Sequence, residues 1–159
     1  MSEIDLFLKK MMYKSPDMKE LLYTYLDISN AKDGFMFLYN KNRKYYPLVS
    51  TTSENLKNLH VNIPEDLNDI HVCNDGNNLE GISSLDVEIK SLLIITIKDD
   101  NNILGLVILV NHISNSFNDD IYISDIYKII CISQFIFKKL IYKNEYNLLY
   151  SDASFSSKD

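Results

Sequence analysis

SLLIITIKDDNNILGLVILVNH, residues 91 to 112, is the stretch of sequence that decides the fold. Two apolar runs rich in Ile, Leu and Val, residues 91–98 and 103–112, flank the polar residues 99–102. Runs of this kind and length favour β-strands, and a short polar segment between them suits a hairpin loop. The stretch therefore predicts two antiparallel strands at the centre of a sheet.

A second hairpin is predicted upstream. The aromatic run at residues 35–40 and the β-branched end of residues 45–52 both favour strands. Pro47 indicates an edge strand or a bulge, because proline cannot donate a hydrogen bond to a neighbouring strand. The basic cluster at residues 41–44 falls between the two runs, where a solvated turn explains it. Alternation over residues 70–73 predicts one more short strand.

Helices are predicted near both ends of the chain. Apolar residues recur at three- and four-residue steps over residues 3–14 and 16–30, and Pro16 suits the first turn of the second helix. The same spacing predicts a long helix over residues 119–148. Residues 151–159 are predicted to be a disordered tail.

Composition limits the class of protein. At 159 residues and 18.5 kDa, the chain fits one domain, residues 1–150. A formal net charge of −6 disfavours nucleic-acid binding, because it repels phosphates. Cys73 and Cys131 follow no disulfide framework, which favours a reducing, cytoplasmic location. No apolar run is long enough to cross a bilayer and no secretory signal is visible, so we expect no membrane association.

The order of these elements and several residues resemble the GAF family. Residues 34–40 are similar to the first strand of that family. The other matching features are the strand at 91–98, its polar turn, Ile103-Leu104-Gly105 and Asn111 in the next strand, and Phe117-Asn118-Asp119 before a long helix. The resemblance implies an α+β fold of PAS/GAF type, an antiparallel sheet with N- and C-terminal helices packed on one face.

The resemblance also implies a regulatory role. Domains of this type are expected to bind small molecules, to form homodimers through their terminal helices, or to do both in signal transduction. We therefore expect a non-catalytic sensory domain that binds a small-molecule ligand, forms a homodimer or does both, and acts on a separate signalling protein. The sequence specifies neither the ligand nor any cofactor. Two alternatives stay open: a ligand-free adaptor that works by protein contact, and a free methionine sulfoxide reductase of GAF type.

Candidate binding residues follow from alternation along the predicted strands. Those suited to orienting a planar ligand between the sheet and residues 53–90 are Phe37, Tyr39, Tyr46, His71, Cys73, Ser84 and Thr96. The last helix is apolar around much of its circumference, so either a helix of the same chain or a second subunit must cover the excess. For the second case, the predicted dimer interface consists of Ile126, Ile130, Phe137, Leu140 and Ile141.

No catalytic or metal-binding constellation is visible. His60, His71 and Cys73 are donors that zinc or haem iron accepts, but their spacing matches no established zinc pattern. The polar turns lack the spacing of a calcium loop, and no phosphate-binding glycine loop or nucleophile elbow occurs. A sulfoxide reductase needs two cysteines in one pocket, whereas Cys131 is expected across the sheet from Cys73. We therefore predict neither a metal site nor an enzyme.

Overall fold

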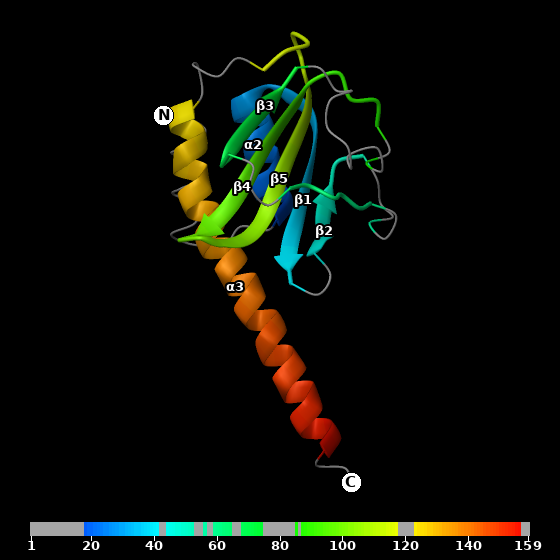
Figure 1. Ribbon diagram of the computed structural model, residues 1–159, viewed down its shortest axis with the longest axis vertical. Coiled ribbons are helices and arrows are strands. Elements are labelled where there is room, and N and C mark those ends of the chain that lie inside the picture. Colours follow the sequence, from blue (N-terminus) through cyan, green and yellow to red (C-terminus); the bar gives the residue numbers. More distant parts are fainter. Residues whose placement is uncertain are drawn as a thin grey trace.

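The computed structural model is an α+β fold built around one antiparallel sheet (Figure 1). It describes residues 18–41, 44–52, 56, 59–64, 68–74, 85, 87–117 and 123–156, with the side chains of the last helix described up to Tyr142. The helix predicted over residues 3–14 and the predicted site residue Ser84 lie outside these ranges.

The sheet has the strand order β2-β1-β5-β4-β3, and each pair of neighbours is antiparallel. β5 is the middle strand and pairs with both β1 and β4, so the stretch quoted first forms the centre of the sheet. Its apolar residues are buried in succession, as expected for strands that are covered on both faces. The strands are β1 (Ala31–Asn40), β2 (Lys44–Ser50), β3 (Ile70–Cys73), β4 (Leu92–Asp99) and β5 (Asn102–His112).

Two helices, α2 (Met18–Ser29) and α3 (Ile123–Ser156), pack on one face of the sheet, which we call the helix face. A single hydrophobic cluster joins Leu22 of α2 and Phe137 of α3 to inward-pointing residues of β1, β2, β4 and β5. α3 continues to Ser156 and so includes most of the segment that was predicted to be a disordered tail. The polar composition of that segment was misleading, because residues 118–159 contain no glycine or proline to end a helix.

The opposite face of the sheet, which we call the loop face, carries a second hydrophobic cluster. Phe35 and Phe37 of β1 belong to it, together with alternate residues of β4 and β5. Its outer layer comes from residues 59–63 and Leu85, which lie in segments between the strands. The sheet is therefore buried on both sides, by helices on one face and by connecting segments on the other.

Gly105 allows α3 to approach the middle strand closely. A Cβ atom at this position would collide with the ring of Phe137 and with the backbone carbonyl oxygen of Phe37. The ladder between β4 and β5 also shifts register between Ile97 and Lys98, beside this glycine. The sequence-based prediction of a close backbone approach or a bulge at Gly105 is therefore confirmed on both counts.

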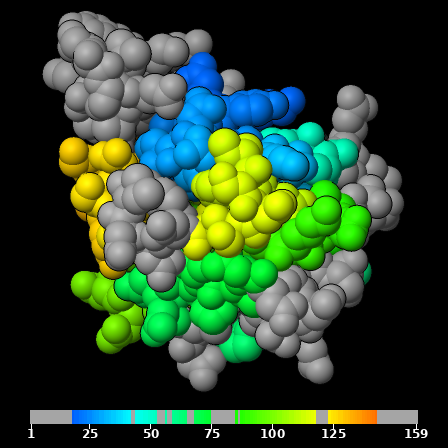
Figure 2. Space-filling view, turned by 90° about the horizontal axis from the view of Figure 1, so that it is seen from above, coloured from blue at the N-terminus to red at the C-terminus, as the bar shows by residue number. Residues whose placement is uncertain are grey.

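Two asparagine side chains fasten the connections at one end of the sheet. The Asn111 amide accepts the backbone N–H of Lys90 and donates to the carbonyl of Glu88, both at 2.7 Å, while its backbone has a φ of 62°. The Asn74 amide accepts the backbone N–H of Phe117 at 2.8 Å and donates to its carbonyl at 3.2 Å. In Figure 2 the turn after β5, in yellow, lies between α2, in blue, and green segments that include β3.

Candidate functional site

Five of the seven predicted ligand-binding residues share the loop face. The pairing of β3 with β4 places His71 opposite Ile94 and Cys73 opposite Leu92, and both partners belong to the loop-face cluster. Thr96 is on the same face by alternation, two residues beyond Ile94. The five residues are Phe37, Tyr39, His71, Cys73 and Thr96.

Tyr46 lies on the helix face, so its assignment to the same ligand site was wrong. The register of β1 and β2 pairs Tyr39 with Tyr45 and Leu38 with Tyr46, which makes Tyr45 the loop-face aromatic. The rings of Tyr39 and Tyr45 are 5.1 Å apart at an interplanar angle of 59°. Alternation within one strand cannot reveal this, because the phase between the two strands is set here by the turn that pairs Asn40 with Lys44.

Buried side chains of the described residues cover part of the loop face. Phe35, Phe37 and Leu85 are fully buried there, and the apolar residues within 59–63 are at most 6% exposed. Within the described residues, these groups occupy the space between the sheet and the connecting segments, where the predicted ligand would lie. Among the same residues, no three His, Cys, Asp or Glu side chains lie close enough together to hold a metal ion.

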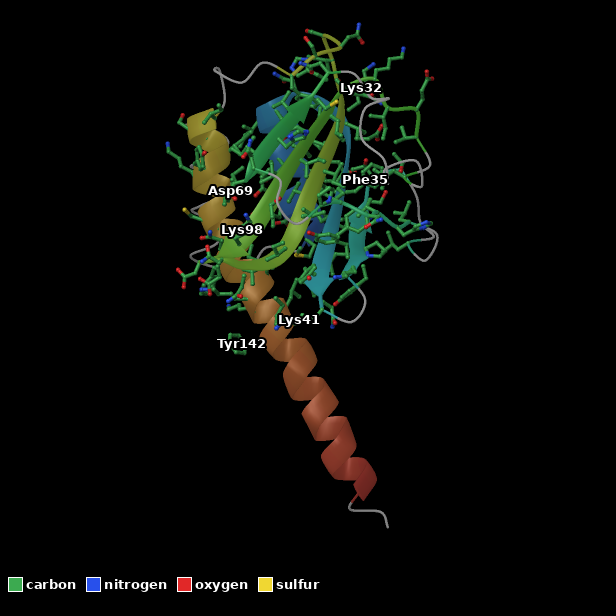
Figure 3. The ribbon with its side chains drawn as sticks, viewed as in Figure 1. Lys32, Phe35, Lys41, Asp69, Lys98 and Tyr142 are labelled. Atoms are coloured by element: carbon green, nitrogen blue, oxygen red, sulfur yellow. The ribbon has the colours of Figure 1, made fainter. Side chains whose placement is uncertain are left out.

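An ion pair and a backbone bond fix the approach to β3 at the sheet edge. Lys98 Nζ lies 3.1 Å from Asp69 Oδ1, and the backbone N–H of Thr96 donates to the Asp69 carbonyl at 2.9 Å (Figure 3). The Asp69 carboxylate is mostly exposed, so the ion pair itself contributes little to stability. We attribute a structural role to these contacts.

The predicted dimer interface is mostly internal. Ile126 and Phe137 are fully buried and Ile130 is 8% exposed, because all three pack into the helix-face core within one chain. Leu140 and Ile141 are half-buried against the same core. The prediction was wrong for the first three residues, since α2 and the sheet cover the side of α3 on which they lie.

A different stripe of α3 is exposed. Tyr127 and Phe135 are each 53% exposed and Tyr142 is 70% exposed, and the exposed Cys131 lies between the first two. Steps of four, four and seven residues place all four side chains on one side of a helix. We call these four residues the α3 stripe. Lys139 Nζ lies 4.8 Å from the centre of the Phe135 ring, so the margin of the stripe is cationic.

A buried polar link joins the two helices. Tyr25 Oη on α2 lies 2.6 Å from Ser133 Oγ on α3, and both residues are fully buried. Ser133 Oγ also donates to the carbonyl of Ile129 at 2.8 Å, so the tyrosine hydroxyl is the donor in the first bond. Burial raises the pKa of Tyr25.

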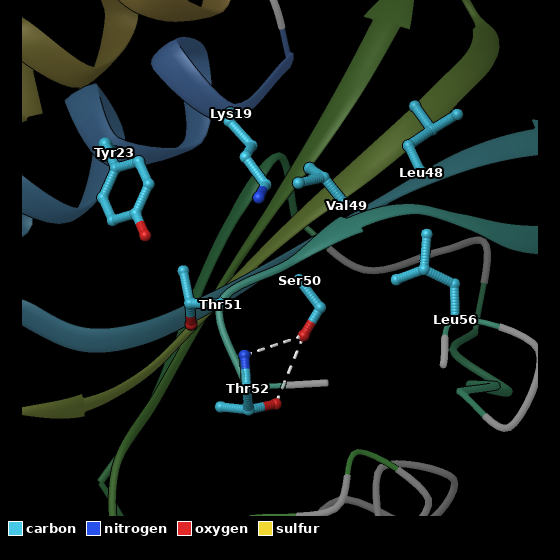
Figure 4. Close-up of a pocket in the computed structure, with 8 residues that line it drawn as sticks. All are labelled: Lys19, Tyr23, Leu48, Val49, Ser50, Thr51, Thr52 and Leu56. Carbon is cyan, nitrogen blue, oxygen red and sulfur yellow. Dashed lines mark hydrogen bonds between the residues drawn. The ribbon is translucent and has the colours of Figure 1, made fainter. Parts of the chain in front are cut away.

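A groove lies beside the edge strand β2, on the opposite side of α2 from this link. Its volume is about 570 Å³, and it is lined by Lys19 and Tyr23 of α2, by residues 48–52, and by Leu56 (Figure 4). Sequence reasoning missed this groove, because its polar residues have the appearance of an ordinary strand end and an ordinary solvated helix face. A volume of this size is within the usual range for small-molecule sites.

The comparisons with known proteins find likeness of fold only. No protein-family model and no curated protein sequence matches the chain. The fold resembles the crystal structure of a domain assigned to a two-component sensor histidine kinase of Sinorhizobium meliloti 1021, with a TM-score of 0.50 and 13% sequence identity. The similarity covers 83% of this chain and 93% of that one. None of the described helices combines the length and hydrophobicity that crossing a lipid bilayer requires.

Proposed function

We propose that this chain is a non-catalytic regulatory domain of GAF type that forms a homodimer through the α3 stripe and acts by contact with a separate signalling protein. The observation that carries the proposal is the exposed aromatic stripe on a helix of 34 residues. A fold similar to that of a sensor-kinase domain supports the signalling part of the proposal.

The geometry of α3 supports a helical dimer. At 1.5 Å per residue the helix is about 50 Å long, and Figure 1 shows its C-terminal half extending beyond the end of the sheet. A helix segment without a packed face is only marginally stable in water, so this extension gains stability if a second helix lies against it. Self-association about a two-fold axis would bury the stripe of each copy against the other.

Native mass spectrometry and light scattering test the dimer. We expect the parent chain to be dimeric, and the variant Phe135→Ser/Tyr142→Ser to be monomeric at the same micromolar concentration. Ile113→Ser is the matched control, because Ile113 is 61% exposed but lies outside α3, and this variant should stay dimeric. A parent chain that is monomeric up to about 100 μM would refute the proposal.

Cys131 gives an independent test of the interface. In a Cys73→Ser background, a short bismaleimide should join two copies through Cys131, because both thiols would lie within the interface. The same reagent should give little covalent dimer with Phe135→Ser/Tyr142→Ser. If the parent chain is dimeric but is not cross-linked, the two copies associate through another surface and the assignment of the stripe is wrong.

Two observations bear on the alternatives: the first supports a ligand-free adaptor over a sensor with its ligand on the loop face, and the second counts against a methionine sulfoxide reductase. The apolar side chains described on the loop face are buried between the sheet and residues 59–63. Cys73 packs against the loop-face cluster, whereas Cys131 is exposed on the helix that covers the other face, so the two thiols do not share a pocket. Free thiols at both positions are in keeping with the cytoplasm. Turnover of free methionine sulfoxide by the purified protein would overturn the non-catalytic assignment.

A further inference from the structure

Apolar side chains alone do not fix the rotation of α3 about its own axis. Positions 130, 133, 137 and 141 of the helix face its packed side, and an apolar residue precedes each of them. The preceding residues are Ile129, Ile132, Ile136 and Leu140. A rotation by one residue, about 100°, would place these four residues where the following ones now pack. Because the hydrophobic effect is not directional, burial of apolar area distinguishes the two rotations only weakly.

Two polar contacts at the end of β4 do distinguish these rotations. Gln134 Nε2 donates to the backbone carbonyl of Lys98 at 2.7 Å, and Lys138 Nζ lies 3.0 Å from Asp99 Oδ2. Figure 1 shows this end of β4 beside α3. Gln134 and Lys138 are four residues apart, so both contacts come from the same side of the helix. Hydrogen bonds depend on direction as well as on distance, whereas the packing of apolar groups does not.

The buried bond between Tyr25 and Ser133 is a third contact of this kind. In the rotated helix, Ile132 would take the position of Ser133, and the Tyr25 hydroxyl would lose its acceptor. A buried donor without an acceptor is costly. The shorter Ser133 and the apolar Phe137 would take the positions of the two residues that contact β4. The rotation would thus break all three polar contacts at once, although it keeps apolar residues in the core.

The rotation of α3 also decides which side chains reach solvent. Cys131 and Phe135 are exposed, and the rotation would put Ile130 and Gln134 in their places. At about 100° per residue, Gln134 and Lys138 lie between the packed side of α3 and the α3 stripe. The contacts to β4 are therefore adjacent to the surface that the stripe forms.

We propose that Ser133, Gln134 and Lys138 form a rotational lock, which keeps α3 in the rotation that exposes the α3 stripe. The contacts to β4 are the accessible part of this lock, since the side chains of Lys138 and Asp99 are 42% and 46% exposed. A change at this end of β4 would therefore control dimerisation. That consequence rests on the proposed function, whereas the lock itself does not.

Thiol labelling tests the lock at two positions that flank residue 131. In a Cys73→Ser/Cys131→Ser background, Ile130→Cys and Ile132→Cys each place one thiol where the native side chain is 8% or 7% exposed, respectively. The rotation would expose position 130 and keep position 132 in the core. Fraying or unfolding of α3 would expose both positions. The ratio of the two labelling rates with a maleimide therefore reports the rotation of the helix.

The double variant Gln134→Leu/Lys138→Met removes both contacts to β4 at similar side-chain volume. We expect it to raise the labelling rate of Ile130→Cys about tenfold, and that of Ile132→Cys by less than about twofold. Lys128→Met is the matched control, because the Lys128 ammonium pairs within α3 itself, and it should leave both rates unchanged. An equal rise at both reporters, no rise at position 130, or the same rise with Lys128→Met would overturn the proposal.

Charge reversal tests the consequence for the dimer. Lys138→Glu should weaken dimerisation about threefold in analytical ultracentrifugation, because two like charges then meet at the end of β4. Asp99→Lys/Lys138→Glu restores opposite charges and should return the dimer to within about twofold of the parent affinity. Failure of this rescue would overturn the role of β4 in presenting the stripe. A monomeric parent chain would refute the dimer and this consequence together, while the labelling rates still decide whether the lock exists.

Discussion

The link between Tyr25 and Ser133 allows a sharp test of how α2 is held against α3. Ser133→Ala leaves the buried tyrosine hydroxyl without its acceptor, and an unsatisfied buried donor costs about 1–3 kcal/mol. Tyr25→Phe removes only the donor, while Ser133 keeps its bond to the Ile129 carbonyl. We therefore expect a smaller loss for Tyr25→Phe, about 1 kcal/mol.

The double variant Tyr25→Phe/Ser133→Ala shows whether the two hydroxyl groups interact. With both polar groups removed, no buried hydroxyl lacks a partner, so Tyr25→Phe/Ser133→Ala should cost no more than Ser133→Ala alone. The resulting coupling energy is about 1–2 kcal/mol. Urea unfolding followed by far-UV circular dichroism measures all four free energies of unfolding. Additive losses, with a coupling near zero, would show that the two hydroxyl groups do not interact in solution.

The same tyrosine predicts a dependence of stability on alkaline pH. Because burial raises the pKa of Tyr25 in the folded state, the unfolded chain loses this proton first, near its ordinary pKa of about 10. Above that pH the unfolded state binds fewer protons, so the free energy of unfolding falls by about 1.4 kcal/mol per pH unit from this residue. Below pH 10 the contribution is constant. The difference between the parent chain and Tyr25→Phe isolates it from the other tyrosines, and an equal slope in both would contradict the assignment.

Substitutions at Gly105 and Asn111 test how α3 and the connections at one end of the sheet are held in place. Gly105→Ala should cost about 3 kcal/mol, because the backbone carbonyl of Phe37 cannot rotate away as a side chain can. The control Gly34→Ala, whose added Cβ would meet only the ends of leucine side chains, should cost about 1 kcal/mol by the same urea titration. Asn111→Ala should lose about 2–3 kcal/mol from two hydrogen bonds and an unfavourable positive φ, and Asn111→Gly about 1 kcal/mol less. Faster hydrogen exchange at Lys90 should accompany both Asn111 variants, and unchanged exchange there would refute the role of the asparagine side chain.

The sheet could be predicted from the sequence because its strongest signals are local. β4 and β5 are continuous apolar runs joined by a polar turn, and such a pair can hardly form anything but a central hairpin. Gly105 added a specific constraint, which the structure explains by the approach of Phe137. The burial of these two strands follows from the apolar residues adjacent to each other in the chain, so a single sequence is enough to predict it.

The assignment of Tyr46 failed for a different reason. Which side of β2 faces the loop layer at Tyr46 depends on the register between two strands, and the turn that pairs Asn40 with Lys44 sets that register. A shift of one residue moves every later side chain to the other face. Only a measured or computed pairing can resolve it, since the residue pattern of β2 is compatible with both phases.

The long helix shows the limit of reasoning from apolar content. Both sides of α3 are rich in apolar residues, and the sequence does not say which side meets the sheet. The structure places Ile126 and Phe137 inside and leaves Phe135 and Tyr142 outside, so the side of α3 predicted to form the dimer interface packs within one chain instead. A tyrosine-bearing side is the better candidate for a surface between subunits, because a tyrosine can keep its hydroxyl in water while its ring is buried. On the sequence alone this difference favours Tyr127 and Tyr142 over Ile126 and Ile130 as surface residues.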